Sequence, residues 1–141
     1  MENIEIKLIE TKNILSIFPL LKELNSTTSD TILKQRLLEM TTQHYKCVGM
    51  YLNNELIGIS GLWFLTRHYC GRTVEPDHVV INFKHRNKGL GKKLFEWIYN
   101  YAQSIGYEAT ELNTYIENVK SHKFYENEGF KKLGYHYLKK F

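Results

Sequence analysis

Residues 79–91 carry an apolar run directly into a basic turn with two glycines, and the pattern of an amphipathic helix follows without a break. The turn, Arg86-Asn87-Lys88-Gly89-Leu90-Gly91, has the form Arg-x-x-Gly-x-Gly. The first turn of a helix leaves backbone N–H groups without intrahelical partners and carries partial positive charge. Glycines there let the main chain approach an anion closely. The spacing therefore predicts a phosphate-binding turn at a helix start, with further positive charge from Lys84, Lys88, Lys92 and Lys93.

Two common nucleotide-binding turns are excluded by spacing. A Walker loop requires Gly-Lys-Ser/Thr, but Gly91 is followed by Lys92 and Lys93, so no hydroxyl is placed for magnesium. A dinucleotide fingerprint requires a third glycine three residues after Gly91, and that position is Leu94. The phosphate ligand must belong to another class.

Two motifs together resemble the GNAT N-acetyltransferase family. Arg-x-x-Gly-x-Gly at a strand-to-helix turn is similar to that family's acyl-CoA cradle, and residues 118–130 resemble its Asn-x-x-(small)-x-x-Phe-Tyr-x-x-x-Gly-Phe element. The resemblance is clearest over residues 45–135. It implies an α/β chain with the GNAT acyl-CoA N-acyltransferase fold, a mixed central sheet of about six to seven strands flanked by about four helices. We expect one such domain over residues 1–141.

The resemblance implies acetyl-CoA as the acyl donor and assigns residues to it. Backbone N–H groups around Val80 and Ile81 are expected to bind pantetheine amides and to stabilise the developing oxyanion. Tyr125 is expected to protonate the departing thiolate, because a phenol stays protonated at neutral pH. Asn118 is expected to cap its helix and to contact the donor. The expected acetyl-CoA-binding residues are Val79, Val80, Ile81, Arg86, Asn87, Lys88, Gly89, Leu90, Gly91, Lys92, Asn118 and Tyr125.

Acetyl transfer to an amine also requires a proton acceptor, since an alkylamine of pKa ~10.4 is almost wholly protonated near pH 7. Asp77 stands nine residues before Arg86, where spermidine-type members of the family carry a glutamate, and Glu75 shares its face of the strand. We expect Asp77 to be the base, with Glu75 assisting. His78 replaces Asp77 in this role if a bulge turns it into the cleft.

The acceptor is less defined than the donor. Glu75 and Asp77 favour a cationic amine, whereas Arg67 and Arg72 suit an acceptor carboxylate. A small-molecule primary amine, attacked directly in a ternary complex, is the leading hypothesis, because no nucleophilic cysteine with suitable partners is evident. A protein N-terminus or lysine, and a non-catalytic acyl-CoA-binding regulatory domain of the same fold, stay open as alternatives.

Bulk properties are those of an ordinary globular chain. It has 141 residues, 43% hydrophobic and 24% charged, with a net charge of +4. A charge of this size does not demand nucleic acid, and no apolar run approaches the roughly 18 residues needed to span a bilayer. We therefore expect a cytoplasmic protein with no nucleic-acid or membrane partner; a homodimer stays open. Two cysteines form no disulfide framework, and the six histidines lack zinc-site spacing, so no metal is expected.

Hydrophobic periodicity predicts alternating strands and helices. Strands are expected over residues 4–9, 45–52, 55–66, 73–83, 107–114 and 130–141. Helices are expected from Thr11, with a bend at Pro19, from Ser29 or Asp30, from about Leu90 to Gly106, and over 118–128. Asn53-Asn54 predicts a hairpin turn, because asparagine tolerates positive φ.

Overall fold

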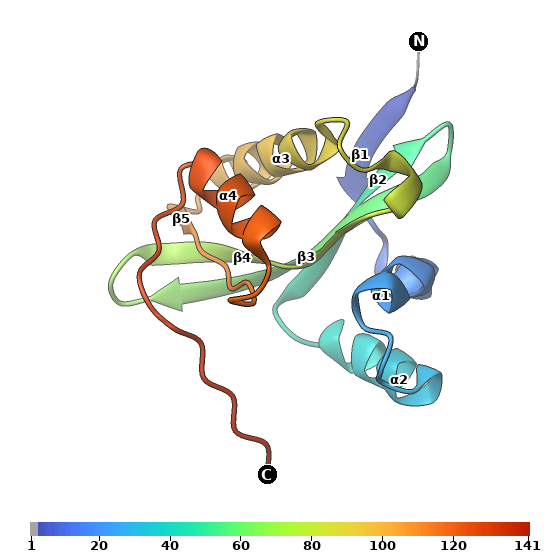
Figure 1. Cartoon of the computed structure of the whole chain (residues 1–141), viewed down its shortest axis with the longest axis horizontal. Coiled ribbons are helices and arrows are strands. Elements are labelled where there is room, and N and C mark those ends of the chain that lie inside the picture. Colours follow the sequence, from blue (N-terminus) through green and yellow to red (C-terminus); the bar gives the residue numbers. More distant parts are fainter. Residues whose placement is uncertain (1–2) are drawn as a thin grey trace.

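A computed structural model, which describes residues 3–141, contains a five-stranded mixed sheet with helices on both faces (Figure 1). The strands are β1 (Ile4–Leu8), β2 (Tyr45–Leu52), β3 (Glu55–Arg67), β4 (Gly71–Ile81) and β5 (Ala109–Thr110). They lie in the order β1-β2-β3-β4-β5, with β1 to β4 antiparallel to their neighbours and β5 parallel to β4. The predicted α/β class and mixed sheet are confirmed.

Four α-helices and two 3-10 helices complete the fold. They are the 3-10 helix η1 (Thr11–Ile17), α1 (Phe18–Leu24), α2 (Asp30–Met40), the 3-10 helix η2 (Phe83–His85), α3 (Leu90–Ser104) and α4 (Val119–Asn127). The predicted helix starts are confirmed: Ser29 Oγ accepts a hydrogen bond from Ile32 N–H, and Asn118 Oδ1 accepts one from Ser121 N–H. The change from 3-10 to α-helix comes just before Pro19.

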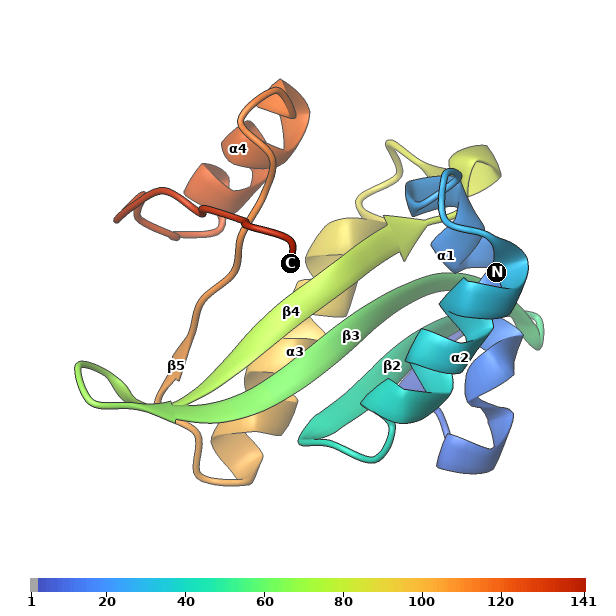
Figure 2. The same ribbon diagram turned by 90° about the horizontal axis from the view of Figure 1, so that it is seen from below.

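The sheet separates two hydrophobic cores (Figure 2). On one face Ile17 of η1 and Leu37 of α2 pack with Cys47, and on the other Leu94 and Ile98 of α3 pack with Val48. Because side chains alternate along a strand, neighbouring residues of β2 enter opposite cores. None of the described helices is long and apolar enough to cross a membrane.

The hairpin between β2 and β3 confirms its sequence prediction. Asn53 and Asn54 have φ of 49° and 69°, as a two-residue turn matched to the twist of the strands requires.

One predicted strand is shortened and another is absent, so the described sheet has five strands instead of six to seven. The expected strand 107–114 pairs with β4 only at Ala109 and Thr110. In this region the carbonyl of Arg72 accepts a hydrogen bond from Glu108 N–H, and the carbonyl of Val74 accepts one from Glu111 N–H. The next β4 residue in that alternation is Pro76, which has no N–H to donate, so the ladder ends there.

The expected final strand, 130–141, is absent. These residues form neither helix nor strand, and Tyr135 and Tyr137 are 78% and 90% exposed. An extended segment needs a neighbouring strand to satisfy its backbone, and β5 is only two residues long. The strand-like pattern of these residues is present in the sequence, but no strand of the described chain lies beside them to pair with.

Candidate active site

A turn of unusual backbone geometry precedes α3. Asn87 and Gly89 both have left-handed φ, 63° and 74°, and Gly89 is the residue immediately before the helix. The first helical bond runs from Lys93 N–H to Gly89 O, and no side chain in the described part of the chain caps this end. The N–H groups of Leu90, Gly91 and Lys92 therefore point out of the helix without helical partners. We call residues 86–92 the cradle.

The basic residues of the cradle are not all turned towards it. Arg86 donates from Nε to the carbonyl of Ile81 at 2.9 Å, and its Nη2 lies 3.3 Å from Glu23 of α1. Lys92 Nζ lies 3.5 Å from Glu128, which also accepts from the hydroxyl of Tyr99. Arg86 thus ties the cradle to α1, and Lys92 ties α3 to the end of α4.

Beyond Val74 the outer edge of β4 has no strand beside it among the described residues, because the chain moves away from β4 after β5 (Figure 2). Asn82 N–H donates to Ile57 of β3, so by alternation Val80 also faces β3. Val79 and Ile81 then face outward, and the contact of Arg86 with Ile81 O agrees with this. The backbone N–H groups of Val79 and Ile81 are therefore free on this edge, whereas that of Val80 faces β3.

A β-bulge interrupts β4 beside this free edge. Asp77 is registered with Gly61 and Val80 with Ile59, so His78 and Val79 together stand opposite Ser60. His78 has φ of +37°, a strained value for a residue with a side chain. The bulge considered for His78 is therefore present, but it does not turn the ring into the cleft.

The bulge buries the His78 ring. Its Nε2 lies 2.7 Å from the hydroxyl of Tyr45, and its Nδ1 is buried without a partner in the described chain. A Cβ on Gly61 would lie 2.1 Å from Nε2, so only glycine leaves room for the ring there. Burial lowers the pKa of His78, despite the opposing charge of Asp77. The ring is therefore neutral near pH 7 and lies within the sheet, against β2 and β3.

Asp77 is exposed, yet both of its carboxylate oxygens are engaged. Oδ1 accepts from the backbone N–H of His78 at 2.8 Å, and Oδ2 accepts from Trp63 Nε1 at 2.9 Å. The Trp63 ring lies 4.9 Å from that of Tyr45. Tyr45, Trp63, Asp77 and His78 form one network across β2, β3 and β4, which we call the bulge network.

Glu75 lines a cavity of about 190 Å3 where β5 leaves β4. We call this the acidic cavity; its lining residues are Arg67, Tyr69, Glu75, Glu111, Leu112 and Asn113. Burial raises the pKa of Glu75, and the charges of Asp77 and Glu111 raise it further. Glu111 is already bound to Arg67, at 3.0 Å, and to the hydroxyl of Tyr69.

Tyr125 lies on α4, half-buried among aromatic rings. Phe95 and Phe130 have ring centres 5.8 Å from its own, and burial raises its pKa. Its hydroxyl has no hydrogen-bond partner within residues 3–141. Its neighbour Phe124 lies 3.5 Å from where a Cβ on Gly91 would sit, so α4 packs directly over the start of α3.

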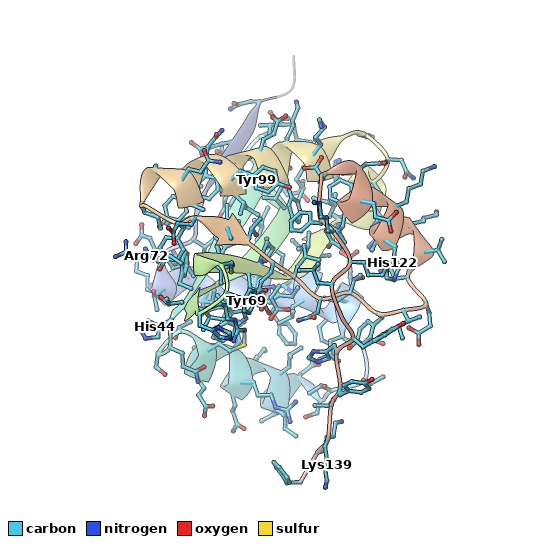
Figure 3. The ribbon with its side chains drawn as sticks, turned by 90° about the vertical axis from the view of Figure 1, so that its left-hand side faces the viewer. His44, Tyr69, Arg72, Tyr99, His122 and Lys139 are labelled. Atoms are coloured by element: carbon cyan, nitrogen blue, oxygen red, sulfur yellow. The ribbon has the colours of Figure 1, made fainter. Side chains whose placement is uncertain are left out.

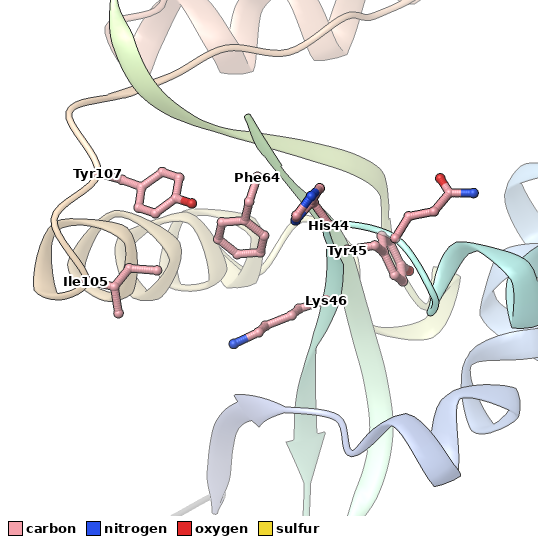
Figure 4. Close-up of a pocket in the computed structure, with 7 residues that line it drawn as sticks. His44, Tyr45, Lys46, Phe64, Ile105 and Tyr107 are labelled. Atoms are coloured by element: carbon pink, nitrogen blue, oxygen red, sulfur yellow. The ribbon is translucent and has the colours of Figure 1, made fainter. Parts of the chain in front are cut away.

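A second hollow, of about 290 Å3, lies at the far end of α3 from the cradle (Figure 4). Lys46 there donates to the hydroxyl of Tyr101, and Ile105 and Tyr107 form another part of the wall. Within the described chain, no three His, Cys, Asp or Glu side chains are grouped to hold a metal ion.

A model of the Acetyltransferase (GNAT) family matches residues 13–130. The chain therefore belongs to the GNAT acetyltransferase family.

Relatives and solved structures agree with this assignment. The aminoalkylphosphonate N-acetyltransferase of Salmonella typhimurium is 30% identical over 88 residues, 62% of this chain and 57% of that protein. The N-acetylaspartate synthetase of Rattus norvegicus is 30% identical over 76 residues, 54% of this chain and 25% of that protein. These matches thus span less than two thirds of the curated relatives.

Two solved structures share the fold over nearly the whole chain. Aminoglycoside N-acetyltransferase AAC(6')-Iy, solved in complex with CoA, superposes with a TM-score of 0.84 at 16% identity, covering 99% of this chain and 95% of that one. Ribosomal-protein-alanine N-acetyltransferase from Brucella melitensis biovar Abortus 2308 has a TM-score of 0.82 at 20% identity, covering 98% and 99%.

Sequence reasoning missed Glu111, Trp63 and Tyr45. Glu111 directly follows β5, and ligands of open α/β sheets bind beyond the carboxyl ends of strands, so that position was a usable signal. Trp63 and Tyr45 reach the bulge only through cross-strand pairing, for which the local sequence gives no signal.

Proposed function

We propose that this enzyme transfers the acetyl group of acetyl-CoA to a primary amine of a small cationic molecule, by direct attack in a ternary complex. The observation that carries the proposal is the acidic cavity, which opens where the free edge of β4 begins. An acceptor amine held there lies beside the strand from which donor-binding N–H groups point.

The charge balance of the cavity favours a cation. The conflict between its acidic and basic residues is resolved by pairing, because Arg67 is neutralised by Glu111 at 3.0 Å. Glu75 has no such ion pair among residues 3–141, and Asp77 lies close enough to raise its pKa. A net negative cavity attracts an ammonium group and repels a carboxylate.

The cradle and the free edge fit the two chemical parts of acetyl-CoA. The uncapped start of α3, with left-handed backbone at Asn87 and Gly89, suits a pyrophosphate. Gly91 and Lys92 add N–H groups, and Lys88 adds positive charge. The outward N–H groups of Val79 and Ile81 suit amide carbonyls and a carbonyl oxygen that gains negative charge during transfer.

Glu75 is the group we assign as proton acceptor. The sequence favoured Asp77, but its oxygens already accept from His78 and Trp63. Both Asp77 oxygens are thus already engaged in the bulge network. Glu75 has a raised pKa, which brings its basicity closer to neutral pH. Asp77 orients the bulge and adds negative charge for the acceptor.

Tyr125 is the group we assign as proton donor to the departing thiolate. Its raised pKa keeps the phenol protonated through neutral pH, and its hydroxyl is not committed elsewhere in residues 3–141. The α4 helix that carries it packs on the start of α3.

The burial of Cys47 supports direct transfer. Burial raises the pKa of Cys47 to about 12, so it stays a thiol and a poor nucleophile. Intersecting initial-rate patterns with varied acetyl-CoA and amine support a ternary complex. Parallel patterns, or an acetylated protein that forms from acetyl-CoA alone, contradict it.

A thiol-release assay tests the substrate class. Acetyl-CoA is mixed with the enzyme and with matched panels of diamines and polyamines, aminoglycosides, amino acids, aminoalkylphosphonates and peptides. We expect turnover to be fastest with small polycationic amines. Turnover confined to peptides contradicts a small-molecule acceptor, and acetyl-CoA binding without turnover for any acceptor contradicts catalysis.

A further inference from the structure

The hollow at the far end of α3 is separate from both proposed substrate sites. We call it the aromatic hollow; it has a volume of about 290 Å3 and is lined by residues 43–46, Phe64, Ile105 and Tyr107. Phe64, Tyr107 and Val74 of β4 all pack against the core beneath α3. Because side chains alternate along a strand, Glu75 and its acidic cavity lie on the opposite face of the sheet. The cradle is at the other end of α3. A molecule bound in the hollow therefore meets neither the donor nor the acceptor.

Aromatic rings form a preformed surface at this hollow. Phe64 is in edge-to-face contact with two tyrosines, whose ring centres lie 5.3 Å away for Tyr107 and 6.5 Å away for Tyr101. Tyr101 in turn stacks on Trp97, with 5.1 Å between the ring centres and 11° between the planes. In Figure 4 the hydroxyl of Tyr107 is directed towards Phe64. All four rings are only partly buried, so this surface is open to a further flat ring.

Positive charge lies at the same place. Lys46 Nζ donates to the hydroxyl of Tyr101 at 3.1 Å and lies 5.9 Å from the centre of that ring. Arg72 reaches the neighbouring turn, because its Nη1 lies 3.4 Å from where a Cβ on Gly106 would sit. Glu108 accepts from the backbone N–H of Arg72. Within residues 3–141, however, no ion pair joins a carboxylate to Lys46 or to Arg72. The charge of Lys46 is therefore available to an anion.

His44 adds a second polar group beside the rings. The backbone N–H of Phe64 donates to the carbonyl of His44 at 2.9 Å, which fixes His44 next to the hollow. Figure 3 shows His44 and Arg72 on the same side of the molecule, with His122 of α4 on the other side. The exposed imidazole of His44 offers a hydrogen-bond donor. Donors and aromatic rings thus converge on one hollow.

We propose that the aromatic hollow is a binding site for a small planar aromatic carboxylate, which is neither substrate of the acetyl transfer. The ring of this ligand packs against Phe64 and Tyr107, and its carboxylate meets the ammonium of Lys46, with His44 as a second donor. The volume is close to the lower end of the ~300–1,000 Å3 typical of small-molecule sites, so one or two fused rings fit. Contacts between aromatic rings favour a flat ring over a saturated one, and Lys46 favours an anion over a cation.

Titration calorimetry with 1-naphthoate tests the site. We expect saturable binding with a dissociation constant of about 1 mM or below, the same with and without saturating CoA. Two analogues then compete against bound naphthoate: 1-naphthylmethylamine keeps the rings and inverts the charge, and the fully hydrogenated acid keeps the charge and loses the aromatic rings. Each is expected to displace naphthoate at least about 10-fold less well. Absence of saturable binding, displacement by CoA, or equal competition by either analogue overturns the proposal.

Amide chemical shifts of 15N-labelled protein locate the ligand. Addition of 1-naphthoate is expected to shift the amide signals of residues 43–46, Phe64 and Tyr107 most. Shifts centred on Glu75 and Glu111 would place the acid in the acidic cavity, and this outcome overturns the proposal.

Matched lysine variants identify the charge that is used. Lys46→Gln is expected to weaken naphthoate binding by about 10-fold or more, because a hydrogen bond to a charged group is lost. Lys46→Arg keeps the charge and is expected to keep most of the affinity. Lys34→Gln is the control, since Lys34 also lies over an aromatic ring, that of Phe18 at 4.7 Å, but between α2 and α1. Thermal unfolding of all three variants is expected to match wild type, because both lysines are exposed. Unchanged affinity in Lys46→Gln, or an equal loss in Lys34→Gln, contradicts the site.

Discussion

The stretch from Glu75 to the start of α3 uses side chains at one end and main-chain N–H groups at the other. From Val79 to the start of α3, the groups available to bind a ligand are main-chain N–H groups, and the local backbone geometry at Gly89 holds them in place. From Glu75 to His78 the available groups are side chains, of which Asp77 and His78 are held by Trp63 and Tyr45 from neighbouring strands. An invariant donor suits a backbone cradle, because no side chain needs to change. A variable acceptor suits a cavity of side chains, whose charge decides what enters.

Replacing Glu75, at the side-chain end of this stretch, is expected to have the largest effect on kcat. Glu75→Gln is expected to lower kcat by about 100-fold or more, while the affinity for acetyl-CoA stays the same. Only ionised Glu75 accepts a proton, and burial raises its pKa, so the acid limb of the rate profile lies above the ordinary value of 4.5. Steady-state rates across pH check both points.

In Glu75→Gln the acid limb attributed to Glu75 is expected to disappear. Glu108→Gln is the matched control, because Glu108 accepts only from the backbone of Arg72 and is exposed. An unchanged acid limb in Glu75→Gln moves the base to Asp77 or to water.

Replacing Gly89, at the main-chain end, is expected to change the affinity for acetyl-CoA instead. Gly89→Asp puts a negative charge at the start of α3 and forces an aspartate to φ of +74°. We expect acetyl-CoA affinity to fall by about 100-fold, equivalent to ~2.7 kcal/mol. Titration calorimetry with CoA measures it.

Gly106→Asp controls for backbone strain, since Gly106 has φ of +86° at the opposite end of the same helix. It should lose comparable stability but keep its affinity for CoA. Equal loss of affinity in both variants would mean that strain, and not the anion site, explains the result.

Tyr125→Phe removes the hydroxyl that we assign as proton donor to the departing thiolate. Removing the hydroxyl is expected to lower kcat by about 10-fold with little change in CoA affinity, because the ring stays packed against Phe95 and Phe130. Tyr99→Phe, which removes the hydroxyl that binds Glu128, should leave kcat near wild type. Wild-type turnover in Tyr125→Phe would remove its role as an acid.

The smallest expected effect comes from the bulge network. Folding lowers the pKa of His78 below its ordinary 6.5, so the unfolded chain binds more protons between those two values. The free energy of unfolding should therefore fall as pH drops below about 6.5, by at most about 1.4 kcal/mol per pH unit. Asp77 and Tyr45 are the ionisable groups in contact with the ring, and Asp77 works against this trend.

Urea unfolding from pH 7 to pH 5 measures the effect. His78→Gln, which keeps a hydrogen-bonding side chain, should flatten the dependence, and the exposed His68→Gln should not. The same slope in wild type and His78→Gln would show that His78 titrates alike in both states.

The contrast between the two ends also explains what the sequence could predict. The cradle was predictable because Gly89 and Gly91 act through their own backbone, and their spacing is local. The helices from Ser29 and Asn118 were predictable for the same reason. The roles of Val79 to Lys92, Asn118 and Tyr125 in binding the donor, and the single-domain organisation, stay predictions.

The acceptor end was only half predictable. Period-two alternation put Glu75 and Asp77 on one face, but it did not show that Trp63 would occupy a carboxylate oxygen of Asp77. The bulge at His78 depends on the room that Gly61 leaves across the sheet. The early end of β5 depends on Pro76, whose missing N–H was visible in the sequence, although its place just beyond the last β4–β5 pair was not.

One comparison of rates tests the account most directly. 1,4-Diaminobutane and 4-aminobutanoate have the same chain length and the same attacking amine, but the far end is cationic in one and anionic in the other. With acetyl-CoA as donor, a cavity lined by Glu75, with the charge of Asp77 nearby, predicts a kcat/KM at least about 10-fold higher for the diamine, equivalent to ~1.4 kcal/mol. Equal values, preference for the aminobutanoate, or no thiol release with the diamine would contradict a cation-selecting acceptor site beside the free edge of β4.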